Sequence, residues 1–363
     1  MSSLCTLLNI QHPIIQSGMG RVAGPELAAE VSRAGGLGIL AGLNVPADAL
    51  RAQIRQLRDL AGGAPFGVNL WLHPELQPPI HPARIRADDI ASVNAALNEM
   101  RRAVDVPESM DAPAPRPDLL PEAIDVMLDE RVPVWSVGLG LPDADLVLRC
   151  HERNVKVMVM IANVEDAREA AALGVDIIVA QGAEAGGHRS TWRVGARSDV
   201  GTLSLVPEVV DAVGVPVVAA GGIADGRGVV AAMALGAAGV LLGTRFVATR
   251  ESLAPDSWKR AILKSTSDAT AVTKAFTGFP ARVLRNRFVD DYEGSGAPVL
   301  PGLLQASLEE EIWTAAKRDD RADYYPMYAG QSVGVIRDLP SAGDVVRTIV
   351  EEARRVMQNL VIG

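Results

Sequence analysis

The first two thirds of the chain alternate between short runs of β-branched apolar residues and longer alanine-rich segments with helical periodicity. The longer segments, such as GPELAAEVSRAGG, begin near Asp, Asn or Pro and end near Gly, as helices do. Strands that alternate with helices are parallel, because each helix carries the chain back across the sheet. The apolar runs predict strands at Pro13–Met19, Leu37–Ala41, Phe66–Trp71, Val132–Val137, Val155–Ile161, Val175–Ala180, Val215–Ala220 and Gly239–Leu242.

Eight parallel strands are the number that closes a barrel, so the pattern predicts an α/β fold of the (β/α)8 TIM-barrel type over residues 1–249. Residues 72–117 depart from it. They are rich in proline around one helical segment, Asp88–Val104, and predict a lid-like insertion after strand three. Residues 250–363 are polar and helical in pattern, which predicts a smaller, mainly helical subdomain whose final helix could return to the barrel.

Composition supports a large core and excludes some partners. Of 363 residues, 48% are hydrophobic and 22% charged, so general disorder is excluded. The net charge is −9 and no Lys/Arg stripe interrupts it, which argues against nucleic-acid binding. One local group, Arg189, Arg193 and Arg197, could hold an anionic substrate, although a solvated loop is the simpler and favoured explanation.

The cysteine content and the lengths of the apolar runs argue against a disulfide-rich, metal-binding or membrane-spanning protein. Cys5 and Cys150 cannot form a disulfide framework and lack the spacing of a metal site, so no metal is expected. No leader pattern and no apolar run of membrane-spanning length occurs, and we expect a cytoplasmic protein without membrane association.

Two glycine-bearing turns follow successive predicted strands near the end of the barrel. Gly221-Gly222 follow Val215–Ala220 and precede a helix near Asp225, and Gly243-Thr244 follow the next strand. Glycines let backbone N–H groups approach a phosphate closely, and a helix N-terminus attracts an anion. Tight turns alone would also explain the glycines, but the loops after strands seven and eight of these barrels frequently bind phosphate. We therefore predict a phosphate site here.

The segment AQGAEAGGHRS places His188 on a glycine-rich loop after strand six. An isolated histidine is usually a packed or surface residue. At the C-terminal rim of a barrel, however, loops carry the catalytic groups, and an ordinary pKa near 6.5 suits proton abstraction at neutral pH. His188 is our candidate catalytic base.

Two amides stand at the same rim, Asn69 at the end of strand three and Gln181 at the end of strand six. A carboxamide offers both a donor and an acceptor, which suits the alternating edge of a flavin pyrimidine ring, although local turn capping is the simpler alternative. Gln16 and Met19, at the end of strand one, could add polar and soft apolar contact with the ring.

Seven segments, spread from about His12 to Gly334, together resemble the nitronate monooxygenase family, formerly called 2-nitropropane dioxygenases. They are HPIIQSGMG, AGGLGILAG, FGVNL, AQGAEAGGH, VVAAGGIADG, GVLLGTRF and YAGQSVG. The resemblance implies an FMN-containing barrel with a helical subdomain. It also implies that His188 removes the proton α to a nitro group, and that flavin and O2 then oxidise the nitronate to a carbonyl compound and nitrite.

The resemblance also implies which residues contact FMN. Asn69 and Gln181 would hold the flavin, Gly186 and Gly187 would line it, and Gln331 would lie near the ring. Gly221, Gly222, Gly243 and Thr244 would hold the phosphate. The complete set of expected cofactor contacts is Gln16, Gly18, Met19, Asn69, Gln181, Gly186, Gly187, Ala220, Gly221, Gly222, Gly243, Thr244 and Gln331.

Two positions depart from the family pattern. Typical members carry Ala-Pro-Met after the glutamine of strand one, whereas this chain reads Ser17-Gly18-Met19, and Ser190 stands where many relatives have glycine. Gly18 lies where a substrate would meet the flavin, so its effect concerns nitroalkane specificity more than FMN binding.

Three alternative functions are open, of which the first also uses a flavin and the others do not. The main one is an FMN-dependent NAD(P)H reductase of the enoyl-CoA, enoyl-ACP or quinone type on the same barrel, in which His188 donates or positions a proton. A flavin-free phosphate barrel would need a lysine or reactive cysteine at a strand end, and Lys156 begins its strand. A non-enzymatic sensor is disfavoured by the central histidine. The C-terminal helices are candidates for a homodimer interface.

Overall fold

A computed structural model describes residues 3–193 and 198–360. In these residues, eight parallel strands form one sheet in the order β1-β9-β8-β6-β5-β4-β3-β2. The sheet closes where β1 meets β2: Ile15 bridges Leu37, and the Gln16 amide donates to the Leu37 carbonyl at 2.9 Å. The strands are β1 (Ile14–Gln16), β2 (Gly38–Ala41), β3 (Phe66–Leu72), β4 (Val134–Gly140), β5 (Lys156–Ile161), β6 (Ile177–Gln181), β8 (Val217–Ala220) and β9 (Gly239–Leu242).

Every predicted barrel strand is confirmed, and most bounds agree within about two residues. The largest differences are at β4, which continues to Gly140 and not only to Val137, and at β1, which ends at Gln16 and not at Met19. Its last ladder bond runs from the Ser17 amide to the Leu242 carbonyl, and the chain then turns away from β9. Gly18 and Met19 therefore lie in the loop above the rim.

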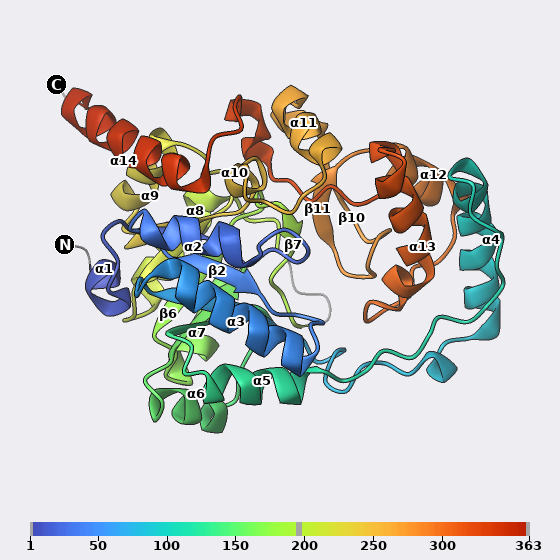
Figure 1. Cartoon of the computed structure of the whole chain (residues 1–363), viewed down its shortest axis with the longest axis horizontal. Coiled ribbons are helices and arrows are strands. Elements are labelled where there is room, and N and C mark those ends of the chain that lie inside the picture. The colour runs from blue at the N-terminus through green and yellow to red at the C-terminus, as the bar shows by residue number, and fades with distance from the viewer. Residues whose placement is uncertain (1–2, 194–197, 361–363) are drawn as a thin grey trace.

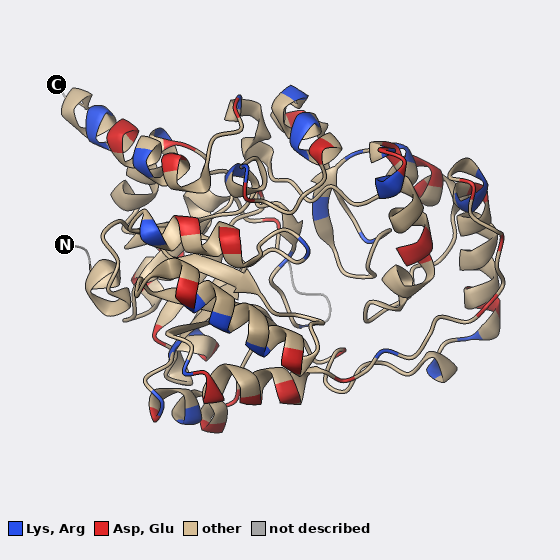
Figure 2. Ribbon diagram, viewed as in Figure 1, with Lys and Arg blue, Asp and Glu red and all other residues tan. Residues whose placement is uncertain are grey.

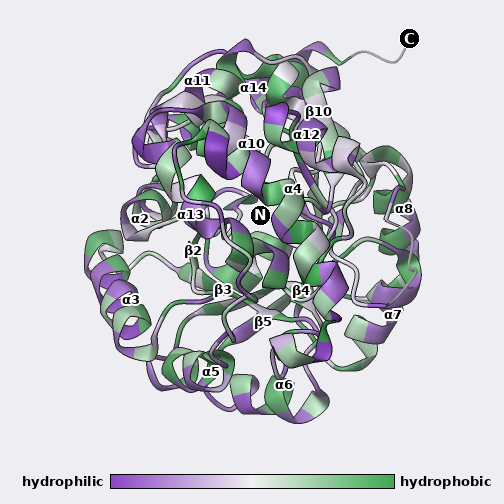
Figure 3. Ribbon diagram, turned by 90° about the vertical axis from the view of Figure 1, so that its right-hand side faces the viewer, coloured by the Kyte–Doolittle hydropathy of each residue, from purple (hydrophilic) through white to green (hydrophobic). Residues whose placement is uncertain are grey.

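Helices surround the barrel, as the end-on view shows for α2, α3, α5, α6, α7 and α8 (Figure 3). The barrel helices are α2 (Pro25–Arg33), α3 (Ala47–Ala61), α5 (Leu120–Asp129), α6 (Ala144–His151), α7 (Val164–Ala172), α8 (Thr202–Ala212), α9 (Gly226–Ala234) and α10 (Thr244–Val247). Their apolar faces form one core with the outward side chains of the strands. The last helix, α14 (Ala342–Asn359), packs against α9 and α2.

The barrel interior is a separate apolar core. Inward side chains such as Ile15, Met158 and Leu241 fill it, and α1 (Ser3–Leu8) covers its N-terminal end with Leu4 and Leu8. Because this end is plugged, the open rim for chemistry is the opposite one, where the parallel strands end.

The remaining elements form a second body beside the rim, on the right in Figure 1. Its core combines helices from the C-terminal part with α4, which belongs to the proline-rich segment after β3 and packs against α12 and α13. The elements are η1 (Pro82–Arg84), α4 (Ala87–Ala103), α11 (Asp256–Lys264), η2 (Ser267–Ala269), α12 (Arg287–Ser295), α13 (Leu304–Arg318), η3 (Ala322–Tyr324) and η4 (Gln331–Val335).

The mainly helical subdomain also contains a small antiparallel sheet that the sequence pattern did not predict. Within the described residues it runs in the order β10-β11-β7, with β10 (Thr270–Thr273) and β11 (Ala281–Leu284) contributed by the subdomain. The third strand, β7 (Gly187–His188), belongs to the loop after β6 of the barrel. The sheet therefore joins the two bodies at the candidate histidine.

Arg101 fastens α4 to the subdomain. Its side chain is 1% exposed and donates to the side-chain oxygens of Asn94 and Asn98, to the Leu308 carbonyl, and to Glu311 at 2.7 Å. We expect Arg101→Met to lower the free energy of unfolding by about 3 kcal/mol, because buried acceptors lose their donor. Urea unfolding measures this. Glu311→Gln is the control, since Glu311 is half exposed and should contribute less than about 1 kcal/mol. Equal losses in both variants would contradict the burial argument.

Charged residues of both signs are interspersed on the outer helices, including α3 and α5 (Figure 2). Glu130, the C-cap residue of α5, has a side chain only 8% exposed. Arg51, Arg55 and Arg58 lie on one face of α3 and donate to it at 2.8–3.1 Å. Burial raises the pKa of Glu130, but the hydrogen bonds from these arginines outweigh burial and lower it to about 2.

This shift predicts a pH-dependent stability. The folded pKa of Glu130 lies below its usual 4.5, so its contribution, about 2 kcal/mol, is complete above pH 4.5 and disappears as the pH falls toward 2. We expect Glu130→Gln to be less stable than the wild type at pH 7 and the difference to vanish near pH 2 in urea titrations. Asp129→Asn, whose carboxylate is 62% exposed, is the control and should cost less than about 0.5 kcal/mol. A difference independent of pH would refute this assignment.

No helix among residues 3–193 and 198–360 has the length and apolar character needed to cross a membrane. In the same ranges, His, Cys, Asp and Glu side chains form no group of three or more that could hold a metal ion.

Candidate active site

The loop after β6 holds His188 by its backbone on two sides. On one side His188 pairs with Ala281 of β11. On the other, the Gln181 side chain donates from Nε2 to the His188 carbonyl and accepts at Oε1 from the Ser190 amide, both at 3.0 Å. Gln181 thus closes the loop over the end of its own strand, and the histidine has a defined position at the rim.

Aromatic rings surround the imidazole of His188. Trp71 packs edge-on at 4.8 Å between ring centroids, Tyr328 lies at 5.3 Å and Phe279 at 6.4 Å. Among the described residues, the polar side chain that contacts the imidazole is Thr277, whose hydroxyl lies 2.9 Å from Nε2. Burial lowers the pKa of His188 to about 4. The ring is therefore neutral at pH 7 and carries the lone pair that a general base needs.

The glycine turns after β8 and β9 lie together, because these strands are parallel neighbours in register, with Ala220 opposite Leu241. Gly221 and Gly222 have φ values of +102° and +73°, which residues with side chains rarely adopt. In the described part of the chain, no protein acceptor is hydrogen-bonded to the amides of Gly222, Gly243 or Thr244. Unused backbone donors at adjacent strand ends form the kind of cradle that binds a phosphate.

The start of α9 does not contribute in the expected way. The Asp225 carboxylate accepts from the amides of Arg227 and Gly228, and Glu352 of α14 accepts from the amide of Gly226 at 3.0 Å. Carboxylates therefore occupy the donors that were predicted to attract the anion. The structure leaves the loop amides as the donors available for a phosphate.

The polar residues predicted at the ends of β1 and β3 have distinct surroundings. Asn69 is 5% exposed and donates to the Ser136 hydroxyl of β4 at 3.2 Å. Gly18 lies directly on Asn69, since a Cβ at position 18 would come within 2.3 Å of the Asn69 Cβ. Gln16 is fully buried in the barrel wall, where its amide exchanges hydrogen bonds with the Ile39 backbone. The Met19 sulfur lies beside Gly243.

The YAGQ segment packs under the glycine turns. Gly186 lies against the backbone of Ala329 and Gly330, without space for a side chain. The Thr244 hydroxyl accepts from the Gly330 amide at 2.9 Å, and the Gln331 amide donates to the Glu184 carbonyl at 2.9 Å. Gly187, by contrast, faces open space. The structure thus brings the His188 loop, the glycine turns and Gln331 to one side of the rim.

The arginines considered for anion binding have other partners. Arg189 is 3% exposed and donates to the carbonyls of Gln181 and Gly182. Arg193 is paired with Asp166 and Glu169 of α7. Both therefore stabilise the loop. Arg197 lies outside the described residues.

The sequence reasoning missed the residues that enclose the histidine. Trp71, Phe279, Thr277 and Tyr328 come from β3, from the segment before β11 and from the YAGQ segment. Two signals were available: Trp71 follows Asn69 on the same face of β3, and Tyr328 opens the YAGQ motif. Thr277 and Phe279 carry no comparable signal, because only the fold brings them to His188.

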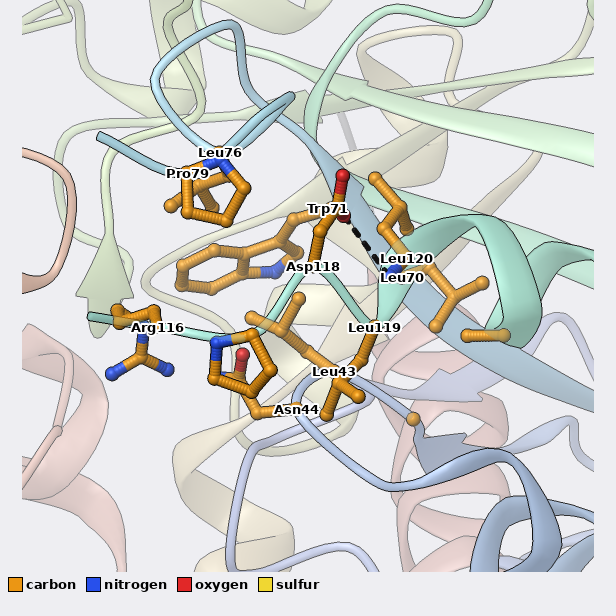
Figure 4. A pocket seen from close by; sticks show the side chains of 13 residues that line it. Leu43, Asn44, Leu70, Trp71, Leu76, Pro79, Arg116, Asp118, Leu119 and Leu120 are labelled. Atoms are coloured by element: carbon orange, nitrogen blue, oxygen red, sulfur yellow. Dashed lines mark hydrogen bonds between the residues drawn. The ribbon is translucent and has the colours of Figure 1, made fainter. Parts of the chain in front are cut away.

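A small cavity is lined in part by Trp71, one of the rings that pack against His188. Figure 4 shows the indole between Leu76 and Pro79 on one side and Leu43 and Asn44 on the other. Its volume of about 30 Å³ is enough for one or two water molecules and too small for a cofactor. The glycine turns are therefore the better place for a phosphate-bearing ligand.

The residues at the rim fit a flavin. Unused amides after β8 and β9 suit its phosphate, Asn69 offers a carboxamide beside Gly18, the Gln331 backbone is held at the same side of the rim, and His188 is a neutral base beside them. These features of barrel and site fit the class of flavin-binding TIM-barrel oxidoreductases.

Comparison with known proteins agrees with this class. The family model for nitronate monooxygenase matches residues 1–352, and the chain belongs to that family. A probable nitronate monooxygenase of Staphylococcus saprophyticus is 35% identical over 97% of both chains. Among solved structures, nitroalkane oxidase from Streptomyces ansochromogenes superposes with a TM-score of 0.87 and 35% identity, covering 99% of this chain and 100% of that one. FabK from Thermotoga maritima superposes with a TM-score of 0.76 and 32% identity, covering 99% and 97%.

Proposed function

We propose that this chain binds FMN and oxidises nitroalkanes and alkyl nitronates with O2, and that His188 is the catalytic base. The observation that carries the proposal is a neutral histidine, held from both sides of its backbone, at the rim that also bears the free glycine amides. FMN would supply the redox chemistry, accepting electrons from the nitronate and passing them to O2. The similarity to a nitroalkane oxidase supports the substrate class.

The chain's own residues would divide the work as follows. Amides of Gly222, Gly243 and Thr244 would hold the phosphate, and Asn69 would contact the flavin ring. Gln181 would act through the loop, since its amide already holds the backbone of His188. The rings around His188 shield part of the imidazole from water, which helps to keep it neutral at pH 7 and able to accept the α-proton of a nitroalkane.

Anaerobic stopped-flow reduction of the bound flavin tests the function. We expect nitroethane and ethylnitronate to bleach the flavin, and NADH and NADPH to leave it oxidised. Rapid bleaching by NADH without bleaching by a nitronate would replace the proposal with the NAD(P)H reductase. Arg189 and Arg193 argue against that alternative, because their charges are engaged within the loop and are not available for a nucleotide phosphate.

Cytoplasmic location and a homodimer stay predictions from the sequence, as do the division at residue 249 and a lid role for residues 72–117. Packing of α4 on α12 and α13 supports grouping that segment with the subdomain.

A further inference from the structure

Thr277 provides the side-chain hydrogen bond that reaches the imidazole of His188. Its hydroxyl lies 2.9 Å from Nε2 and is buried, with a side chain 6% exposed. The residue belongs to the turn between β10 and β11, so it comes from the subdomain and not from the barrel that carries the histidine.

We propose that Thr277 is a positioning residue that accepts a hydrogen bond from the Nε2–H of His188, which leaves the lone pair of Nδ1 to take the substrate proton. The inference rests on the proposed function of His188 as base. Beyond that function, it specifies that Nδ1 of His188 takes the proton and that Thr277 selects this nitrogen.

The choice of tautomer follows from the hydrogen-bond partners. A threonine hydroxyl has one hydrogen, and the Phe279 carbonyl, 3.4 Å from Oγ1, is an acceptor for it. Thr277 then accepts from Nε2–H. In the opposite tautomer Nδ1–H would need an acceptor, and among the described residues none is hydrogen-bonded to it. Buried donors without an acceptor are rarer and more costly than acceptors without a donor.

The Thr277 segment is held firmly against the histidine loop. The Arg189 amide donates to the Pro280 carbonyl at 2.9 Å, and Ala281 pairs with His188 in the small sheet. Arg282 donates from Nε and Nη2 to the Ala183 carbonyl. These bonds fix the hydroxyl and the imidazole on adjacent segments, so the contact does not depend on a flexible loop.

The proton transfer is then balanced. The C–H bond α to the nitro group breaks, its electron pair stays on the substrate as the nitronate, and the proton goes to Nδ1. The imidazolium formed still donates from Nε2 to Thr277. Of the described side chains in contact with the ring, Trp71, Thr277, Phe279 and Tyr328, the one that titrates is Tyr328; burial raises the pKa of its hydroxyl, so it stays neutral.

Nitrogen-15 spectra of the histidine ring test the tautomer in the FMN-bound protein. The His188 signals are assigned by their loss in His188→Asn, among the five histidines of the chain. We expect Nε2 to show the shift of a protonated nitrogen and Nδ1 that of a bare one, and Thr277→Val to mix the two forms. A protonated Nδ1 in the wild type would overturn the inference.

Kinetics of Thr277 variants provide the second test. Thr277→Val should lower kcat/KM for neutral nitroethane roughly 10–100-fold, by analogy with the loss of a partner that orients a metal-bound histidine. Preformed ethylnitronate should keep its rate, FMN content should not change, and Thr277→Ser should recover most of the loss. Thr273→Val is the matched control, because Thr273, at the end of β10, is also buried but its hydroxyl accepts from the Ala275 amide and does not contact His188.

The outcomes distinguish the positioning role of Thr277 from the role of His188 as base. If His188→Asn loses nitroethane turnover and Thr277→Val does not, only the positioning role is wrong. Equal losses for nitroethane and ethylnitronate in Thr277→Val, or no recovery with serine, would also overturn it. If His188→Asn keeps wild-type turnover of nitroethane, the proposed function itself is wrong.

Discussion

Replacing His188 by Asn should lower kcat/KM for a neutral nitroalkane by about 10²–10⁴-fold, the range typical of general-base catalysis. Asparagine fits the space and keeps the backbone pairing with Ala281, but it has no basic nitrogen. A preformed nitronate should lose far less, because its proton is already gone. Steady-state oxygen consumption with nitroethane and ethylnitronate measures both rates on the same preparation.

The pH profile adds a signature to this variant. Since burial lowers the pKa of His188 to about 4, the wild-type kcat/KM for nitroethane should stay level down to about pH 5 and fall below it. In His188→Asn, the residual kcat/KM for nitroethane should no longer fall below about pH 5. Flavin content, read from the absorbance after gel filtration, is the control for binding. If both substrates keep wild-type rates, the histidine has been given the wrong role.

Gly222→Asp should release FMN. Position 222 has a φ of +73° and its amide has no protein acceptor in the described residues, so a carboxylate here would repel a phosphate bound to the turn. A Cβ at this position would meet the Glu184 side chain at 3.4 Å, which is ordinary contact. We expect at least a hundredfold weaker FMN binding, measured by fluorescence titration of the apoprotein.

Gly222→Asn is the matched control for charge. Asparagine and aspartate have nearly the same shape and both tolerate a positive φ, so they impose similar backbone strain. Only aspartate adds a negative charge. The asparagine variant should therefore keep much more FMN than the aspartate variant. Equal loss in the two would mean that the turn is sensitive to shape, and full retention in both would place the phosphate elsewhere.

The barrel was predictable because its signals are local. Each strand is a short apolar run bounded by turn residues, and runs such as Gly239–Leu242 agree with the structure residue for residue. The small sheet was not predictable. β7 has only the residues Gly187 and His188, and its partner Ala281 is far along the chain, so no periodicity marks either segment.

In the candidate site, too, some residues were predictable from local sequence and others were not. The sequence correctly placed Gln181 at the end of β6 and His188 in the loop after it, whereas Asn69, predicted at the end of strand three, lies three residues before the end of β3. The direction of a side chain could not be predicted from the sequence. The Gln16 amide hydrogen-bonds the Ile39 backbone inside the barrel wall, whereas the Asn69 amide donates to the Ser136 hydroxyl of the neighbouring strand. The partners of His188 depend on how the subdomain docks, which is a property of tertiary packing. Thr277 is an example, because nothing near it in the sequence distinguishes it from neighbouring threonines.

The pairing of β7 with β11 has a consequence for engineering. The histidine loop and the hairpin that orients it form one ladder, although one belongs to the barrel and the other to the subdomain. A chimaera that takes its subdomain from a relative should therefore take residues 182–190 from the same parent. Otherwise the transplanted hairpin would meet a foreign loop, and the imidazole would lose its orientation even with every rim residue conserved in type.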